Sequence, residues 1–269
     1  MKSFRYVRLD PTGNLTCLVL DPVEKAEEPG ITARLMAECE QVAYLEAARA
    51  PRARARIRLM GGEFCGNAAM ASACYLAERD GMRAGEVLLE VSGAEGPVRC
   101  GVRKGEDAWE GSAEMPPVLG AEALRAEGHA LTAVRMEGIR HFIAEGPLPN
   151  REGSEALLRR LAEHIPEEAA GLLQWNRERG EMRPLVLVKG SGTLVWETAC
   201  GSGSAAVGAL EALRRGDGET ETAVLQPGGE IRARVRVRDG RPETVVISGR
   251  VRLSPEKILF VKQIGRAHV

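Results

Sequence analysis

The sequence predicts an α/β (α+β) fold of two pseudo-symmetric domains, and an internal repeat is the first observation behind this prediction. The motif at 64–69 (FCGNAA) recurs at 199–204 (ACGSGS). Each copy opens an alanine-rich apolar run that predicts a helix, and each run closes on a glycine sixteen residues after its cysteine, at Gly81 and Gly216. Two divergent copies indicate two related domains and argue against a solenoid.

The segments that follow each predicted helix are the second observation. After the first copy, two extended segments separated by a turn occupy 86–91 and 98–103. The same order recurs after the second copy, at 222–225 and 231–238. Each half is therefore predicted to be a helix enclosed by strands.

The consecutive prolines Pro116 and Pro117 are the third observation, because they interrupt regular strand pairing and mark a boundary. We expect an N-terminal domain at 1–116 that carries Cys65 and a C-terminal domain at 117–250 that carries Cys200. The tail, 251–269, holds a strand-like segment that we expect to return to the first domain. Further helices are predicted at Ile31–Glu38 and Glu155–His164 from the helical spacing of their apolar residues.

Composition narrows the classes of function. The chain has 269 residues, 44% of them hydrophobic and 28% charged, with a formal net charge of −1. This balance gives no reason to expect a nucleic-acid or anionic-membrane partner. The sequence has no apolar run of the length of a membrane span and no signal-peptide core, so we expect a cytoplasmic protein. With four histidines and no Cys-x-x-Cys pair, the sequence has few candidate metal ligands, so no metal site is predicted.

The two repeated cysteines, Cys65 and Cys200, are the candidate catalytic residues. A Cys-Gly step at a helix start places a thiol beside unpaired N–H groups and the positive end of the helix dipole, which favours thiolate. A matched pair suits removal of a proton from one face of a carbon and delivery to the other. Both cysteines could instead be structural or incidental to an anion-binding loop, but packing gives no reason for the same thiol to recur at the same helix position. The other four cysteines are interpreted as structural: Cys17, Cys39, Cys74 and Cys100.

Candidate substrate-binding residues surround the two motifs. The backbone N–H groups of Gly66, Asn67, Gly201 and Ser202 could converge on a carboxylate and stabilise enolate-like charge, and helix capping is compatible with this role.

Three residues outside the helix starts leave alternatives open. Glu197 could bind a substrate ammonium or be solvated or capping. Asn14 lies in a predicted turn, where turn chemistry also explains it. His141 is flanked by apolar residues, and a core or hinge role is favoured over catalysis.

These motifs carry a family resemblance that spans most of the chain. The segments 63–69 (EFCGNAA) and 197–203 (ETACGSG) resemble the two cysteine blocks of the cofactor-independent amino-acid racemases and epimerases of the diaminopimelate epimerase fold. The Gly13-Asn14 step and the segment 140–143 (RHFI) are similar to two further motifs of that family. The resemblance implies two pseudo-symmetric domains, each a strand barrel around a central helix, which close over an amino acid with one cysteine on each face. It also implies a mechanism without a cofactor, in which one cysteine is thiolate and the other thiol.

Departures from the diaminopimelate epimerase pattern bear on the substrate. Those enzymes carry an arginine before the second cysteine, and this chain has 191–199 (SGTLVWETA) instead. The pattern resembles the histidine racemases that supply D-histidine for opine-type metallophores. The alternatives are a diaminopimelate epimerase of lysine or cell-wall biosynthesis and, from another class, a non-catalytic amino-acid-binding protein. The sequence leaves open which cysteine is the base for the L-isomer and whether the protein forms a homodimer.

Overall fold

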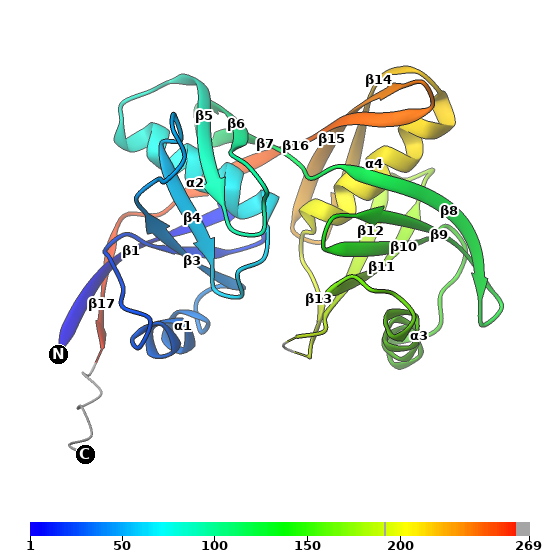
Figure 1. The fold of residues 1–269 in the computed structure, drawn as a ribbon, viewed down its shortest axis with the longest axis horizontal. Coiled ribbons are helices and arrows are strands. Elements are labelled where there is room, and N and C mark those ends of the chain that lie inside the picture. The colour runs from blue at the N-terminus through cyan, green and yellow to red at the C-terminus, as the bar shows by residue number, and fades with distance from the viewer. Residues whose placement is uncertain (191, 262–269) are drawn as a thin grey trace. The chain divides into compact units, whose positions relative to one another are not determined.

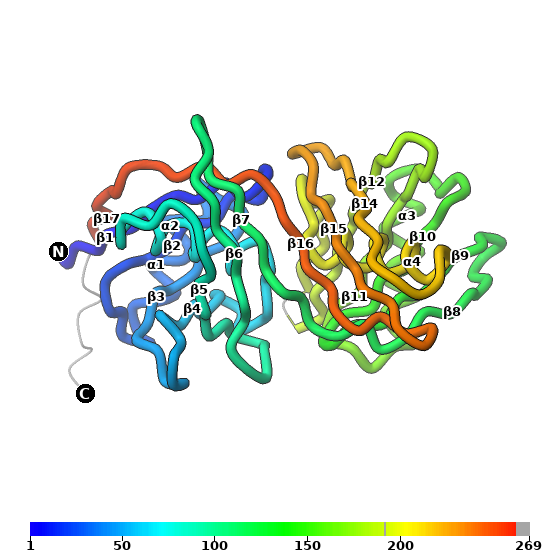
Figure 2. Tube along the Cα trace, turned by 90° about the horizontal axis from the view of Figure 1, so that it is seen from above, coloured from blue at the N-terminus to red at the C-terminus, as the bar shows by residue number. Residues whose placement is uncertain are grey.

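The computed structural model describes residues 1–190 and 192–261, which form a mixed α/β fold of seventeen strands and four helices. The described chain separates into two compact units, residues 1–111 with 250–261, and residues 112–249. It passes from one unit to the other twice, inside strand β7 (Trp109–Glu114) and inside strand β16 (Arg241–Leu253). Both crossings can be followed in Figure 2.

The first unit is a ring of strands around one helix. Its elements are β1 (Lys2–Pro11), β2 (Thr16–Val19), α1 (Glu28–Leu35), β3 (Gln41–Glu46), β4 (Ala55–Leu59), α2 (Gly66–Arg79), β5 (Ala84–Val91), β6 (Val98–Lys104) and β17 (Lys257–Val261). Among the described residues, the pairings run from β1 through β2, β3, β4, β5, β6, β7 and β16 and return to β1, which closes the ring. Figure 1 shows α2 among these strands, and its residues 66–77 are all buried. The small alanine side chains of α2 allow strands to pack against it on all sides.

The second unit also packs strands around one helix, α4. Its elements are β8 (Val118–Ala126), β9 (His129–Met136), β10 (Ile139–Ala144), α3 (Arg151–Glu163), β11 (Ala169–Asn176), β12 (Glu181–Val188), β13 (Thr193–Trp196), α4 (Gly201–Arg215), β14 (Gly218–Gln226) and β15 (Gly229–Arg238). Helix α4 is buried from Gly203 to Ala212. Helix α3 covers a separate apolar cluster with Leu157 and Leu158, which pack against β11 and β12.

Most predicted elements are confirmed. Both cysteine motifs open helices, and the four predicted extended segments lie in β5, β6, β14 and β15. The helix predicted at Ile31–Glu38 is wrong in its bounds, because α1 begins three residues earlier with Pro29 in its first turn and ends at Leu35. The helix predicted at Glu155–His164 begins earlier too, where the Asn150 side chain accepts from Gly153 N at 2.9 Å and caps the helix.

The structure locates the predicted domain boundary and the predicted tail. Pro116 and Pro117 lie in the link between β7 and β8, whereas the units divide at Gly111/Ser112 and at Gly249/Arg250. The domain bounds taken from the sequence stay a prediction. The strand-like segment of the tail lies in β17, which pairs antiparallel with β1. Residues 262–269 of the tail, and Ser191, lie outside the described residues. No helix in the described part of the chain is long and apolar enough to cross a membrane.

Candidate active site

The two motif cysteines occupy the same position, the N-cap of a buried helix. Cys65 has φ −138° and ψ 110°, and Cys200 has φ −111° and ψ 110°. Each sulfur accepts a hydrogen bond from the N–H group three residues further on, Cys65 Sγ from Ala68 N at 3.5 Å and Cys200 Sγ from Gly203 N at 3.3 Å. The repeated sequence thus builds the same local structure twice, and in both copies the sulfur takes the place of the usual capping oxygen.

In the first unit, a side-chain amide contacts the sulfur of Cys65. Gln41 begins β3 and pairs in parallel register with Thr16, which begins β2. Gln41 Nε2 lies 3.3 Å from Cys65 Sγ, 2.8 Å from Thr16 Oγ1 and 2.8 Å from Asn14 Oδ1, so its two N–H groups are shared among three acceptors. Cys65 is half-buried, so its sulfur is partly open to solvent.

Two predicted binding residues, Asn14 and Asn67, belong to the same network. Asn67 Nδ2 donates to Asn14 Oδ1 at 3.3 Å, and both side chains are buried. Asn14 Nδ2 donates to Glu40 Oε2 at 2.7 Å. The structure therefore brings Asn14 and Asn67 together with Cys65, and their role in substrate binding stays a prediction.

In the second unit, Cys200 is 4% exposed. Burial raises the pKa of the Cys200 thiol well above its usual range, because an ion is poorly solvated there, and the Glu197 carboxylate acts in the same direction. Hydrogen bonds from Ser202 and Gly203 oppose this shift without cancelling it. The expectation that a helix start favours thiolate is thus wrong for Cys200, because desolvation outweighs the helix dipole.

His141 is connected to this half-site through Ser202. His141 Nε2 and Ser202 Oγ lie 2.9 Å apart, and Ser202 Oγ lies 3.5 Å from Cys200 Sγ. The imidazole is completely buried, and burial lowers the pKa of His141 to about 3. His141 is therefore neutral near pH 7. The predicted core role is correct, but no sequence pattern indicates the connection of His141 to Cys200.

Gln226 fixes the backbone of the second helix start. Its Oε1 accepts from Cys200 N at 2.7 Å, and its Nε2 donates to Ser204 Oγ at 2.9 Å. Ser204 Oγ in turn donates to Cys200 O at 2.8 Å. Sequence reasoning missed Gln41, Thr16 and Gln226, since each lies far along the chain from its cysteine and outside any motif.

The remaining predicted binding residues lie at the helix starts and after β13. Gly66 and Gly201 are the first residues of α2 and α4, so their N–H groups are among those that a helix leaves unpaired within itself. Glu197 follows β13, where its N–H donates to Pro184 O at 3.0 Å. Convergence of the N–H groups of both helices on one carboxylate stays a prediction.

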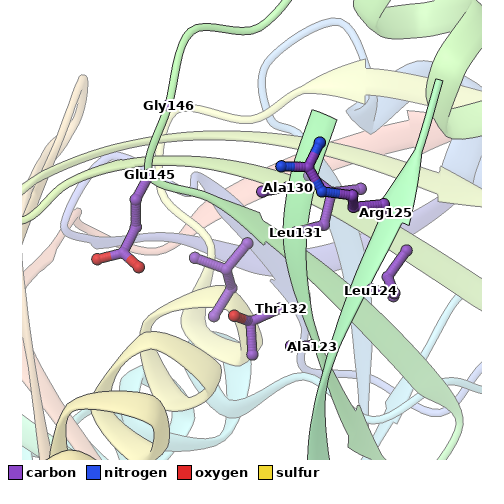
Figure 3. A pocket seen from close by; sticks show the side chains of 9 residues that line it. Ala123, Leu124, Arg125, Ala130, Leu131, Thr132, Glu145 and Gly146 are labelled. Atoms are coloured by element: carbon purple, nitrogen blue, oxygen red, sulfur yellow. The ribbon is translucent and has the colours of Figure 1, made fainter. Parts of the chain in front are cut away.

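A cavity of about 480 Å³ opens elsewhere in the second unit (Figure 3). It lies over β8, β9 and the end of β10, and its charged lining residues are Arg125 and Glu145. Neither cysteine motif nor any predicted site residue lines it. We therefore treat this cavity as separate from the candidate active site.

Comparison with known proteins connects this geometry to a class of enzyme. The model of the histidine racemase CntK N-terminal domain matches residues 3–260. The histidine racemase of Staphylococcus aureus is 26% identical over 238 residues, which cover 84% of this chain and 86% of that protein. The histidine racemase of Fusobacterium nucleatum is 27% identical over 237 residues, which cover 83% and 86%.

Solved structures of low sequence identity share the fold. A predicted epimerase from Pseudomonas aeruginosa has a TM-score of 0.71 at 16% identity, covering 96% of this chain and 100% of that chain. A hydroxyproline epimerase from Agrobacterium vitis has a TM-score of 0.68 at 15% identity, covering 96% and 92%. The mixed α/β fold is therefore similar to that of proline racemase-like proteins.

Proposed function

The chain belongs to the histidine racemase family and is an amino-acid racemase, and from this premise we propose that it interconverts L- and D-histidine with the thiols of Cys65 and Cys200. The observation that carries the proposal is the equivalence of the two cysteines. Each caps a buried helix, and each sulfur accepts the N–H three residues further on. Such a pair suits a reaction that must act on both faces of one carbon.

In the proposed reaction, one cysteine acts as thiolate and removes the α-proton, and the other acts as thiol and protonates the opposite face of Cα. The S–H bond formed on the first sulfur balances the one broken on the second, so the roles are exchanged after each turnover. The two units would act as the domains of a diaminopimelate epimerase-like fold and close over the amino acid. Closure would exclude water and strengthen electrostatic interactions with the carbanion.

The substrate carboxylate is assigned to the helix starts. The N–H groups of Gly66 and Asn67 in α2, and of Gly201 and Ser202 in α4, begin helices whose dipoles favour negative charge. Charge moves onto the carboxylate as Cα loses its proton, so these donors would bind the transition state more tightly than the substrate. Glu197 and Asn14 are assigned to the amino group and to the framework of the site.

Histidine is favoured over diaminopimelate by two observations. The matched family model and both curated relatives are named histidine racemases. The segment 192–199 also lacks an arginine that could bind a second carboxylate. The D-histidine formed would be available for assembly into a metallophore.

The test is a racemase assay on the full-length protein without added pyridoxal phosphate and with EDTA. L-Histidine, diaminopimelate and L-proline are supplied separately, and the enantiomers are resolved by chiral chromatography. We expect D-histidine to form and the other two to be poor substrates. Failure to racemise histidine, with turnover of either competitor, would overturn the substrate assignment.

Cysteine variants test the assignment of the residues. Cys65→Ser and Cys200→Ser keep a capping side chain and should each lower kcat by about 100-fold or more. Cys74→Ser is the matched control, because Cys74 is a buried thiol inside α2, nine residues beyond its N-cap. Near-normal activity in either of the first two variants would show that two thiols are not required.

A further inference from the structure

We propose that the Glu40 carboxylate is a positioning group that orients the Asn14 and Gln41 amides, so that Gln41 presents N–H to Cys65 Sγ and favours thiolate there in the free enzyme. This inference deepens the proposed function and rests on it for its catalytic meaning. All the residues involved belong to the first unit.

The orientation begins at Glu40. Glu40 is exposed, and its carboxylate oxygens accept hydrogen bonds. Asn14 Nδ2 donates to Glu40 Oε2 at 2.7 Å. An amide has its NH₂ on one side and its carbonyl oxygen on the other, so this bond directs Asn14 Oδ1 away from Glu40. The Asn14 residue is only 7% exposed, which leaves little solvent to stabilise a flipped amide.

The second step passes this orientation to Gln41. Asn14 Oδ1 accepts from Gln41 Nε2 at 2.8 Å. Thr16 supports the same arrangement, because its hydroxyl donates to Asn14 O at 3.3 Å and leaves Oγ1 to accept from Gln41 Nε2 at 2.8 Å. A reversed Gln41 amide would set its oxygen against these two acceptors, which is unfavourable in a buried network.

The third step reaches the sulfur. Gln41 Nε2 is 3.3 Å from Cys65 Sγ and shares one of its two N–H groups between this sulfur and an oxygen of the network, and Ala68 N is 3.5 Å from the sulfur. Amide nitrogens donate hydrogen bonds and do not accept them, so neither group can receive a thiol proton. Hydrogen bonds to an ionised partner are roughly twice as strong as neutral ones. Both contacts therefore stabilise the thiolate more than the thiol.

The opposite arrangement surrounds Cys200. That sulfur is buried, and the Glu197 carboxylate raises the pKa of its thiol further. The free enzyme would therefore hold a proton on Cys200 and thiolate at Cys65. In the two-thiol reaction, Cys65 is then the base toward the enantiomer that binds the resting enzyme.

The experiment measures the alkylation of Cys65 in the full-length protein without substrate. Iodoacetamide labelling is quenched at intervals between pH 5.5 and 9.5, and mass spectrometry of the Cys65 peptide gives the rate at each pH. Thiolate is the reactive form, so the midpoint of this profile reports its formation. The variants are Gln41→Glu, Gln41→Met and Glu40→Gln. Glu38→Gln is the matched control, since it removes a charge from the same loop and its carboxylate accepts from Tyr6 instead.

We expect Gln41→Glu and Gln41→Met to raise the Cys65 midpoint by about one pH unit, which is about a tenfold loss of rate below the midpoint. Glu40→Gln should shift it in the same direction by less, because a neutral amide no longer imposes one orientation on Asn14. Glu38→Gln should leave it unchanged. If Gln41→Glu fails to fold, Gln41→Met decides the result.

Unchanged Cys65 midpoints in folded Gln41 variants would overturn the inference, and an unchanged midpoint in Glu40→Gln alone would overturn the role of Glu40. Neither outcome depends on turnover. A protein that does not racemise histidine but shows these shifts would contradict the proposed function alone, and an active racemase without them would contradict this inference alone.

Discussion

His141 lies directly opposite Gly171 in the parallel register of β10 and β11. A Cβ atom built at Gly171 would be 2.1 Å from His141 Nδ1 and 2.7 Å from Cε1. The missing side chain therefore makes the room that the buried imidazole occupies. This space allows Nε2 to reach Ser202, which contacts Cys200.

Gly171→Ala should lower the free energy of unfolding by about 1–3 kcal/mol, because overpacking a rigid interior displaces the imidazole. Urea denaturation measures the loss. Gly146→Ala is the control, since a Cβ at Gly146 meets no atom within 4 Å. In the double variant Gly171→Ala/His141→Ala, the clash is absent. The stability losses of the two single variants should therefore sum to more than the loss measured for the double variant. Additive losses would show that the residues do not interact.

The buried imidazole also predicts a pH dependence of stability. The pKa of His141 falls to about 3 in the folded protein, below its unfolded value of about 6.5. The contribution of the neutral His141 imidazole to the free energy of unfolding is therefore complete above about pH 6.5 and is lost as pH falls from there toward 3. By pH 5 the loss should be about 2 kcal/mol relative to pH 7. Denaturation of the wild type and of His141→Gln as a function of pH isolates the contribution of His141 to stability. Parallel pH profiles for the two proteins would contradict this prediction.

Ser202 links His141 to Cys200, so Ser202→Ala should leave a buried imidazole nitrogen without its hydroxyl partner. We expect a loss of about 1–3 kcal/mol in the free energy of unfolding. Ser202→Thr keeps the hydroxyl and should recover most of this loss. A wild-type value for Ser202→Ala in urea denaturation would show that the hydroxyl does not satisfy the imidazole.

Glu197 adds to the effect of burial on Cys200, and its removal should favour thiolate. Glu197→Gln is expected to lower the alkylation midpoint of Cys200 and to increase its labelling rate at neutral pH about threefold. Burial persists in this variant, so Cys200 should still react more slowly than Cys65. Glu163→Gln, an exposed change on α3, is the control. A Cys200 midpoint that does not fall would remove Glu197 from the half-site.

The sequence predicted the parts of the fold that depend on local signals. Alanine-rich periodicity and a Cys-Gly step are visible over fifteen residues, so α2 and α4 are predicted with their starts, whereas the role of the two cysteines as N-caps was not predicted. The start of α1 was missed because apolar spacing begins at Ile31, whereas Pro29 starts the helix. Alternating apolar residues located β15 and its neighbours.

The partners of the two sulfurs could not be predicted in this way. Gln41 reaches Cys65 through the parallel pairing of β2 with β3, a tertiary contact with no sequence motif. Gln226 reaches Cys200 from the end of β14. The charge state of Cys200 was missed for a different reason. A helix start is visible in the sequence, but the burial that opposes it is a property of the whole unit.

The central claim, that two thiols act on opposite faces of one carbon, is tested most directly by racemising L-histidine in heavy water at low conversion. The two-thiol account predicts D-histidine that carries deuterium at Cα, while the remaining L-histidine keeps its protium. D-Histidine without deuterium, or L-histidine that gains deuterium as fast as D-histidine forms, would contradict it.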